Sequence, residues 1–418
     1  ARDILVFLPG TGEIDRTHQN IQTWAEENAI DIVPLHGSLQ LEAQQKALRA
    51  GPRRRIILST NIAESSVTVD GVACVIDTGL AKNMKFDLRT GFSRLELGRI
   101  SKASAQQRAG RSARQYPGVC YRLWNKLDES SMPAHEIPEI LRSELSDSLL
   151  FLAAQGVRDF ESFSWFEKPA KLSLQKAVEN LLSIGAIDTA NNITPVGKTL
   201  LTWPLPPRLA KLMLSSIEMK VPQLGADVAA ILQERDFVTR QGSEGAIGDQ
   251  LESDILFRLD LLNQFRDGPS PRNAHRLGLQ TVDRSAQQIL SYVKDAVSIK
   301  VKDLSVSLQQ LLLSSFADRL CRRRVPGAER ALMIGGRGVK LAADSLVRES
   351  EFFFALDGIE NSKNSETTVA MASGIDKDVL LGALQSRIEK RKELKFDREK
   401  AQFYLRETKV FGEVKPAG

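Results

Sequence analysis

The chain has 418 residues, of which 42% are hydrophobic and 26% charged, with a formal net charge of +5; this suits about three domains with real cores and permits nucleic-acid binding without requiring it. No apolar run reaches the ~18 residues that span a bilayer and no signal peptide is visible, so we expect a cytoplasmic protein with no membrane partner. Cys74, Cys120 and Cys321 are spaced as reduced core residues rather than as metal ligands.

The first 130 residues alternate strands with helices, which predicts a parallel α/β sheet. Continuous apolar runs such as 4–8 are typical of strands buried on both faces. Because the chain opens directly on such a run, without an initiator methionine, we expect an N-terminal portion to be missing. The expected strands are 4–8, 30–35, 55–59, 72–77 and 118–124, and the expected helices are 14–28 and 40–50.

Short polar loops follow three of the expected strands. Loops at the carboxyl ends of parallel strands are where such sheets bind ligands, and glycines permit close approach of a phosphate backbone. Loops of this kind are also common as simple turns, so they do not by themselves identify a ligand. The candidate strand-binding residues are Gly10, Thr11, Gly37, Ser38, Thr60 and Asn61.

Residues 82–99 alternate polar and apolar side chains on both sides of Arg89-Thr90-Gly91, which predicts a β-hairpin. The hairpin is basic, and it is either a solvated ribbon or a second contact to nucleic acid. Its basic residues are Lys82, Lys85, Arg89, Arg94 and Arg99.

The stretch 101–114 carries the most specific pattern in the chain. Ser104 and Gln107 have the spacing of a capping box, which predicts the start of a helix. On such a helix Gln107, Arg111 and Arg114 share one face. Two guanidinium groups beside an amide form a receptor for a polyphosphate, and the alternative is a solvated basic helix.

Residues 57–71 (ILSTNIAESSVTVDG) and 101–111 (SKASAQQRAGR) resemble motifs V and VI of superfamily 2 helicases, in the DEAH/RHA branch and its bacterial HrpB-type members. The resemblance implies that 1–130 is a second RecA-like domain. It also implies that Gln107 orients the attacking water and that Arg111 and Arg114 are arginine fingers. The family usually has Ala-Gly before its last arginine, whereas this chain has Ser112 and Ala113, which should stiffen the helix.

The same resemblance implies further contacts to nucleotide and strand. Ser66 would sense the nucleotide state, Thr68 and Asp70 would contact the ribose, and Leu48 would lie against the adenine. The three loops would follow the sugar-phosphate backbone of a single strand, and the hairpin would act as a wedge where a duplex separates.

The remainder resembles the family's accessory domains. We expect a winged-helix domain at 131–202, a helical-bundle, ratchet-like domain at 203–305 and an OB-type β-barrel at 306–418. Gly197-Lys198-Thr199 imitates the end of a phosphate-binding loop but lacks the glycine that should precede it. Arg319 and the following arginines 322–324 either form a basic approach for nucleic acid or are solvated surface.

The chain contains no Walker A motif and no Asp-Glu-Ala-His sequence. The resemblance therefore implies that ATP with Mg²⁺ is held mainly by a missing first RecA-like domain, that this fragment binds no cofactor tightly, and that it does not hydrolyse ATP alone. The expected partners are that domain and single-stranded RNA or DNA, and the expected state is a monomer. The alternatives are a non-catalytic binding module for single strands and, less favoured, a phosphate-metabolite enzyme.

Overall fold

The computed structural model describes the chain except residues 1, 38, 40, 66, 88–90, 116, 240–251, 270, 294–302, 361–366, 384–388, 398–401, 412–413 and 418. The chain divides into two compact units, one formed by residues 1–86 and 93–143 and the other by 87–92 and 144–418. The three accessory domains expected after residue 130 therefore lie almost wholly in one unit, and their separate boundaries stay predictions.

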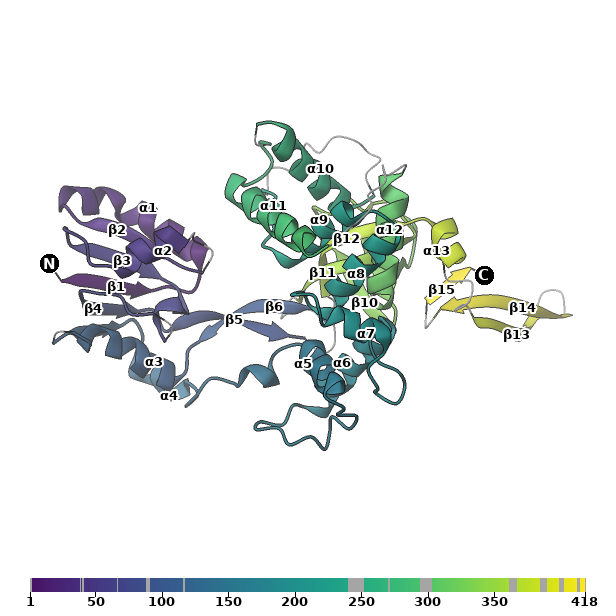
Figure 1. Cartoon of the computed structure of the whole chain (residues 1–418), viewed down its shortest axis with the longest axis horizontal. Helices are drawn as coiled ribbons and strands as arrows, with labels where there is room; N and C mark the ends of the chain where they lie inside the picture. Colours follow the sequence, from purple (N-terminus) through teal and green to yellow (C-terminus); the bar gives the residue numbers. More distant parts are fainter. Residues whose placement is uncertain are drawn as a thin grey trace. The chain divides into compact units, whose positions relative to one another are not determined.

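The first unit is built on a five-stranded parallel sheet, as predicted (Figure 1). The central strand buries both faces: Leu5 and Phe7 belong to one core cluster and Val6 to the other. Helix α1 (Thr11–Glu27) packs on the Val6 face, and α2 (Leu41–Leu48) packs on the opposite face. The strand order is β2 (Asp31–Leu35), β3 (Arg55–Ser59), β1 (Asp3–Phe7), β4 (Val72–Asp77) and β7 (Val119–Arg122).

The predicted hairpin is confirmed as β5 (Leu80–Phe86) paired antiparallel with β6 (Ser93–Arg99). Its strands belong to the first unit, whereas its tip, 87–92, belongs to the second. After the hairpin come α3 (Lys102–Ala109), a 3₁₀ turn (Gly110–Ala113), α4 (Lys126–Ser131) and a second 3₁₀ turn (Glu139–Leu141).

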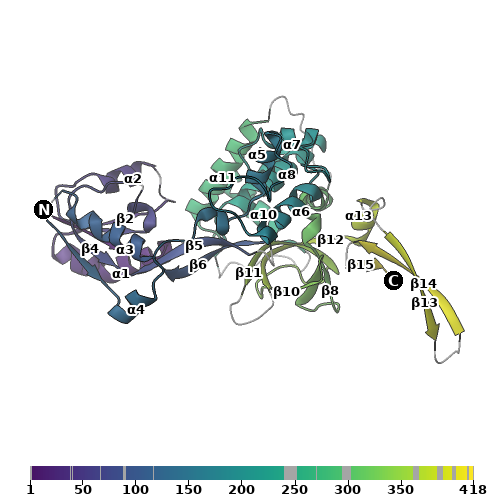
Figure 2. The same cartoon turned by 90° about the horizontal axis from the view of Figure 1, so that it is seen from below.

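The second unit packs helices against one side of a β-barrel (Figure 2). Gly197 lies inside helix α7, where an added Cβ would come 2.0 Å from the carbonyl oxygen of Ala186, so this glycine serves close packing rather than a phosphate loop. The helices are α5 (Ser146–Ala154), α6 (Lys171–Ser183), α7 (Pro195–Leu200), α8 (Pro207–Glu218), α9 (Pro222–Gln233), α10 (Asp254–Asp267), α11 (Arg276–Ser291) and α12 (Leu304–Phe316).

The barrel is closed, with the strand order β10, β12, β11, β8, β9. It begins later than predicted, because the apolar run before Ala317 forms the end of α12 and a 3₁₀ turn (Ala317–Arg319) rather than a strand. The barrel strands are β8 (Leu320–Arg323), β9 (Arg330–Met333), β10 (Arg337–Leu341), β11 (Phe352–Glu360) and β12 (Thr367–Ile375); α13 (Lys377–Ala383) and a separate sheet of β13 (Glu389–Asp397), β14 (Gln402–Phe411) and β15 (Val414–Ala417) follow. None of the helices in the described part of the chain has the length and apolar character of a membrane span.

Candidate functional site

The start of α3 differs from the prediction. Ser101, not Ser104, is the N-cap, because its Oγ accepts a hydrogen bond from the backbone N–H of Ser104 at 3.1 Å. The N–H of Ser101 in turn donates to the carboxylate of Glu136 at 2.8 Å. A glutamate 35 residues away thus takes the place of the predicted Gln107, so the predicted capping box is wrong.

The helix also changes pitch before the arginines. It ends at Ala109 and continues as the 3₁₀ turn Gly110–Ala113, so Gln107, Arg111 and Arg114 do not share one α-helical face as predicted. Ala113 lies in the right-handed region, outside the positive-φ positions of the chain. The alanine that replaces the family's glycine therefore introduces no backbone strain.

Arg111 and Arg114 both point to the loop between β3 and β4. Half-buried Arg111 donates from Nη1 to the carbonyl oxygen of Val67 at 2.8 Å and from Nη2 to the carbonyl oxygen of Glu64. Exposed Arg114 donates to the hydroxyl of Thr68. Burial and the neighbouring Arg114 lower the pKa of Arg111. The structure thus brings together Arg111, Arg114 and Thr68, three of the predicted nucleotide residues.

Asp70 lies at the other end of the same loop, bonded to Leu48 at the end of α2. The N–H of Asp70 donates to the carbonyl oxygen of Leu48 at 2.9 Å, while the Leu48 side chain packs against the sheet core. Gln115 connects the segment after α3 to the end of the β3–β4 loop. Its Nε2 donates to Asp70 Oδ1 at 3.0 Å, and its Oε1 accepts from the N–H of Gly71 at 2.9 Å. The predicted Ser66 lies outside the described residues, and exposed Gln107 stands apart on α3.

Sequence reasoning missed Arg108, which is only 1% exposed. Its Nε donates to Glu64 at 2.9 Å, its Nη1 donates to Asp77 at 3.0 Å, and its guanidinium lies 4.8 Å from the ring centre of Phe7. No local signal in the sequence marks it, because its partners Glu64 and Asp77 lie 44 and 31 residues earlier in the chain.

The predicted strand-binding loops lie, as expected, where β1, β2 and β3 end. Gly10 is the N-cap of α1, and Thr60 is the N-cap of a 3₁₀ turn (Asn61–Ala63). Glu13 in the first turn of α1 binds Lys82 of the hairpin at 2.9 Å, and this hydrogen bond lowers the pKa of Glu13. Thr11, Gly37 and Asn61 flank the same strand ends, whereas Ser38 lies outside the described residues.

The basic residues predicted to contact nucleic acid in the hairpin and the barrel have different surroundings. Lys85 pairs with Glu96 across the hairpin at 3.3 Å, and Arg89 lies outside the described residues. Arg319 is not on an open surface: its guanidinium donates to two backbone carbonyl oxygens and lies 4.3 Å from the ring centre of Phe92. This internal position differs from the basic approach predicted from the arginine cluster.

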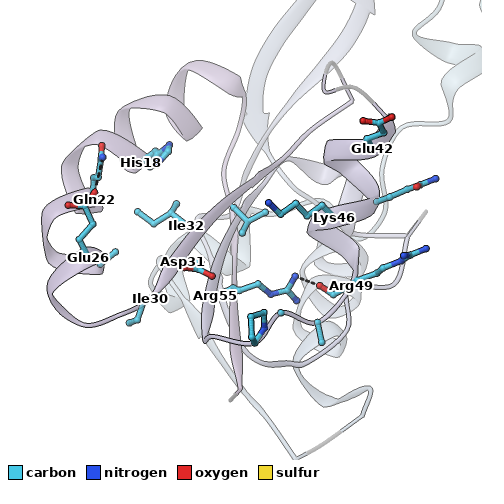
Figure 3. Close-up of a pocket in the computed structure, with 16 residues that line it drawn as sticks. His18, Gln22, Glu26, Ile30, Asp31, Ile32, Glu42, Lys46, Arg49 and Arg55 are labelled. Carbon is cyan, nitrogen blue, oxygen red and sulfur yellow. Dashed lines mark hydrogen bonds between the residues drawn. The ribbon is translucent and has the colours of Figure 1, made fainter.

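A groove of about 790 Å³ opens at the edge of the sheet in the first unit (Figure 3). His18, Gln22 and Glu26 of α1 line one side. Lys46 of α2 and Arg49, the residue after that helix, line the other, with the start of β2 between them. Its lining includes none of the predicted nucleotide or strand residues, so it is a separate feature.

Comparisons with known proteins give one consistent picture. Residues 1–115 match the family described as the helicase conserved C-terminal domain. The chain is 30% identical over 381 residues to the ATP-dependent RNA helicase HrpB of Escherichia coli, covering 90% of this chain and 43% of that protein. It is 38% identical over 219 residues to the ATP-dependent RNA helicase HrpA of Borreliella burgdorferi, covering 52% and 27%.

Solved structures agree with these relatives. The crystal structure of the E. coli DEAH/RHA helicase HrpB superimposes with a TM-score of 0.73 at 26% identity, covering 99% of this chain and 48% of that one. The chain thus spans less than half the length of each of these proteins.

Proposed function

Because this chain corresponds to the C-terminal portion of a DEAH/RHA helicase of the HrpB type, we propose that it supplies the arginine side of a composite ATP site and part of a channel for single-stranded nucleic acid. In this proposal Arg111 and Arg114 are arginine fingers, and Gln107 orients the attacking water. The bound nucleotide would be presented by a second RecA-like domain, since phosphoryl transfer in such enzymes needs a phosphate loop and metal ligands.

The observation that supports the finger assignment is the pairing state of the two arginines. Among the described residues neither guanidinium forms an ion pair; each binds only neutral oxygens of the β3–β4 loop. An arginine has five N–H donors, so both retain donors for phosphate oxygens. Buried Arg108, by contrast, has two carboxylate partners and serves the fold.

The residues present fit a triphosphate but not its metal ion. Two neighbouring guanidinium groups match phosphate oxygens, and the hydroxyl of Thr68 and the carboxylate of Asp70 would contact the ribose. No cluster of three or more metal-ligating side chains occurs in the described ranges, so Mg²⁺ would be held elsewhere. The metal would neutralise charge on the transferred phosphoryl group. We therefore propose that the chain alone does not hydrolyse ATP.

The strand channel would be formed by the loops after β1, β2 and β3. Gly10, Thr60 and Asn61 place backbone groups and small polar side chains at one edge of the sheet. Such groups bind phosphates without reading base sequence. The names of the relatives favour RNA as the strand. The second candidate, a non-catalytic binding module, predicts salt-dependent binding of single strands without ATP turnover.

The decisive experiment measures strand-stimulated ATP hydrolysis with the first RecA-like domain present in the same polypeptide. Arg111→Ala and Arg114→Ala should each lower kcat by about 10³- to 10⁵-fold, the usual contribution of an arginine finger. Arg53→Ala is the matched control, because Arg53 is an exposed arginine of the same unit outside the site. Unchanged turnover in both finger variants would reject the assignment.

A further inference from the structure

The tip of the β5–β6 hairpin is built into the barrel. Phe92 is only 4% exposed and packs in the barrel core with Val339, Phe353 and Val369. Gly358 of β11 makes room for it, because a Cβ at that position would come 2.8 Å from the Phe92 ring. The tip therefore inserts an aromatic side chain into a core whose other members come from residues 321–372.

The backbone of the tip is closed by its own hydrogen bonds. The N–H of Asp87 donates to the carbonyl oxygen of Phe92 at 2.9 Å, and the N–H of Gly91 donates to the carbonyl oxygen of Asp87 at 2.7 Å. Gly91 has φ +71°, a conformation that favours glycine. These bonds leave the carbonyl oxygen of Gly91 facing the 3₁₀ turn before β8, where it accepts from Arg319.

Arg319 joins this tip to the rest of the unit. Its Nη2 donates to the carbonyl oxygen of Gly91 at 2.6 Å, and its Nη1 donates to the carbonyl oxygen of Leu356 at 3.2 Å. Its guanidinium carbon lies 4.3 Å from the ring centre of Phe92 and 5.7 Å from that of Phe316. Desolvation lowers the pKa of Arg319 to about 10, with Arg208 acting in the same direction and Asp318 opposing, so the group stays charged at neutral pH. This pair of hydrogen bonds from one planar guanidinium, here called the fork, requires arginine, because a lysine offers neither planar donors nor a stacking face.

A second arginine holds the turn that carries Arg319, the anchor of the tip. Arg208 of α8 donates to both carboxylate oxygens of Asp318, at 2.6 Å and 3.0 Å, and to the amide oxygen of Asn180 on α6. The residue next to Arg319 is thereby tied to two helices of the same unit. The turn that carries Arg319 is thus held to these helices by contacts that do not involve the hairpin.

We infer that Arg319 is a positioning residue that fixes the tip of the hairpin in the second unit, and not a ligand of nucleic acid. The strands of the hairpin are assigned to the first unit, whereas its tip and Arg319 both belong to the second. The consequence for strand binding rests on the proposed function: Arg319 holds the tip of the basic hairpin without contacting the nucleic-acid strand.

The anchor itself is tested without nucleic acid, by hydrogen–deuterium exchange of peptides covering 86–93 in the 418-residue chain. Arg319→Met removes the fork, and Arg319→Lys keeps the charge but not the planar donors. Because hydrogen bonds to charged groups are strong, both variants should speed exchange at the tip by about 10- to 100-fold. Arg324→Met is the matched control, since Arg324 is an exposed arginine of the same cluster and should leave tip exchange unchanged.

Two outcomes overturn the inference. The first is an unchanged rate of tip exchange in both Arg319→Lys and Phe92→Leu. Phe92→Leu is a milder substitution that tests the contact between Arg319 and Phe92 if Arg319→Met fails to fold. The second combines two results. Tip exchange in Arg319→Lys stays at the wild-type rate, and the salt dependence of oligouridylate binding in Arg319→Met falls by about one phosphate contact. Together these would identify Arg319 as a direct ligand of the nucleic acid. If no variant of the chain binds the oligonucleotide, the proposed function fails while the exchange result still decides the anchor.

Discussion

Replacing Arg108 by methionine should destabilise the first unit strongly while leaving Arg111 and Arg114, the proposed fingers, in place. Arg108 is the only described link between the carboxylates of Glu64 and Asp77, and Asp77 is fully buried. Asp77 Oδ2 has no hydrogen-bond partner among the described residues, so the carboxylate depends on the bonds to Oδ1 from Arg108 and from the N–H of Gly79. Removing one partner of a buried ion pair typically costs about 3–5 kcal/mol.

That loss is a large part of the roughly 5–15 kcal/mol that stabilises a typical domain. Because the chain has two units, it should be measured locally, as the free energy of opening from amide exchange in β1 and β4. Adding Asp77→Asn to Arg108→Met should recover part of the loss, because the amide is not a buried charge. Arg114→Met, which removes an exposed arginine, should change stability by less than about 0.5 kcal/mol.

The result that would refute this reasoning is a loss below about 1 kcal/mol in Arg108→Met, the scale of an exposed salt bridge. Water would then reach Asp77, and the ion pair would not hold the sheet to α3. No recovery on adding Asp77→Asn would point instead to the lost contact with Phe7.

Two further predictions concern stability. Glu252 accepts three consecutive backbone N–H groups, from Arg348, Glu349 and Ser350; burial opposes its ionisation, but the N–H groups of Ser350 and Glu349 hold its pKa below the usual 4.5. The stabilisation by ionised Glu252 is therefore complete above about pH 5 and is lost as pH falls through the depressed pKa. In urea titrations Glu252→Gln should be about 1–3 kcal/mol less stable than the wild type at pH 7, and this difference should close on acidification. A stability difference that does not depend on pH would contradict the prediction. Gly118→Ala would place a Cβ 2.0 Å from the carbonyl oxygen of Ser112 and should cost about 1–3 kcal/mol or more by exchange in β7, whereas Gly110→Ala, with open space around it, should be neutral or stabilising.

The sequence predicted what depends on local pattern. Apolar runs and their spacing predicted the parallel sheet, a hairpin within 82–99 and a helix within 101–114, because each depends on residues close together in the chain. They did not predict where that helix starts or where it changes to a 3₁₀ turn. The motif V and VI resemblance identified Thr68, Arg111 and Arg114, which the structure brings together through hydrogen bonds of the β3–β4 loop.

What the sequence could not give are roles decided by distant partners. Ser101, the N-cap of α3, donates its own N–H to Glu136, 35 residues further on. Arg108 is buried against Asp77, 31 residues earlier. Arg319 is the extreme case, since its acceptor Gly91 is 228 residues away. In a run of arginines nothing local distinguishes Arg319, which stacks on Phe92, from exposed Arg324, so the sequence predicts either a basic approach for nucleic acid or a solvated surface for the whole cluster.

Glu64 shows how the two kinds of arginine are connected. Its carboxylate accepts from Arg108 at 2.9 Å, and its carbonyl oxygen accepts from Arg111. One residue therefore connects the start of the β3–β4 loop both to the sheet core and to Arg111. Arg111 spends two of its five N–H donors on this loop, so binding a phosphate does not require it to release Val67 or Glu64. A phosphate that moves Arg111 therefore moves the loop as well. Thr60 and Asn61 stand three to four residues before Glu64. Under the proposed function the strand therefore contacts one end of the segment 60–64, and the nucleotide acts on its other end through Arg111.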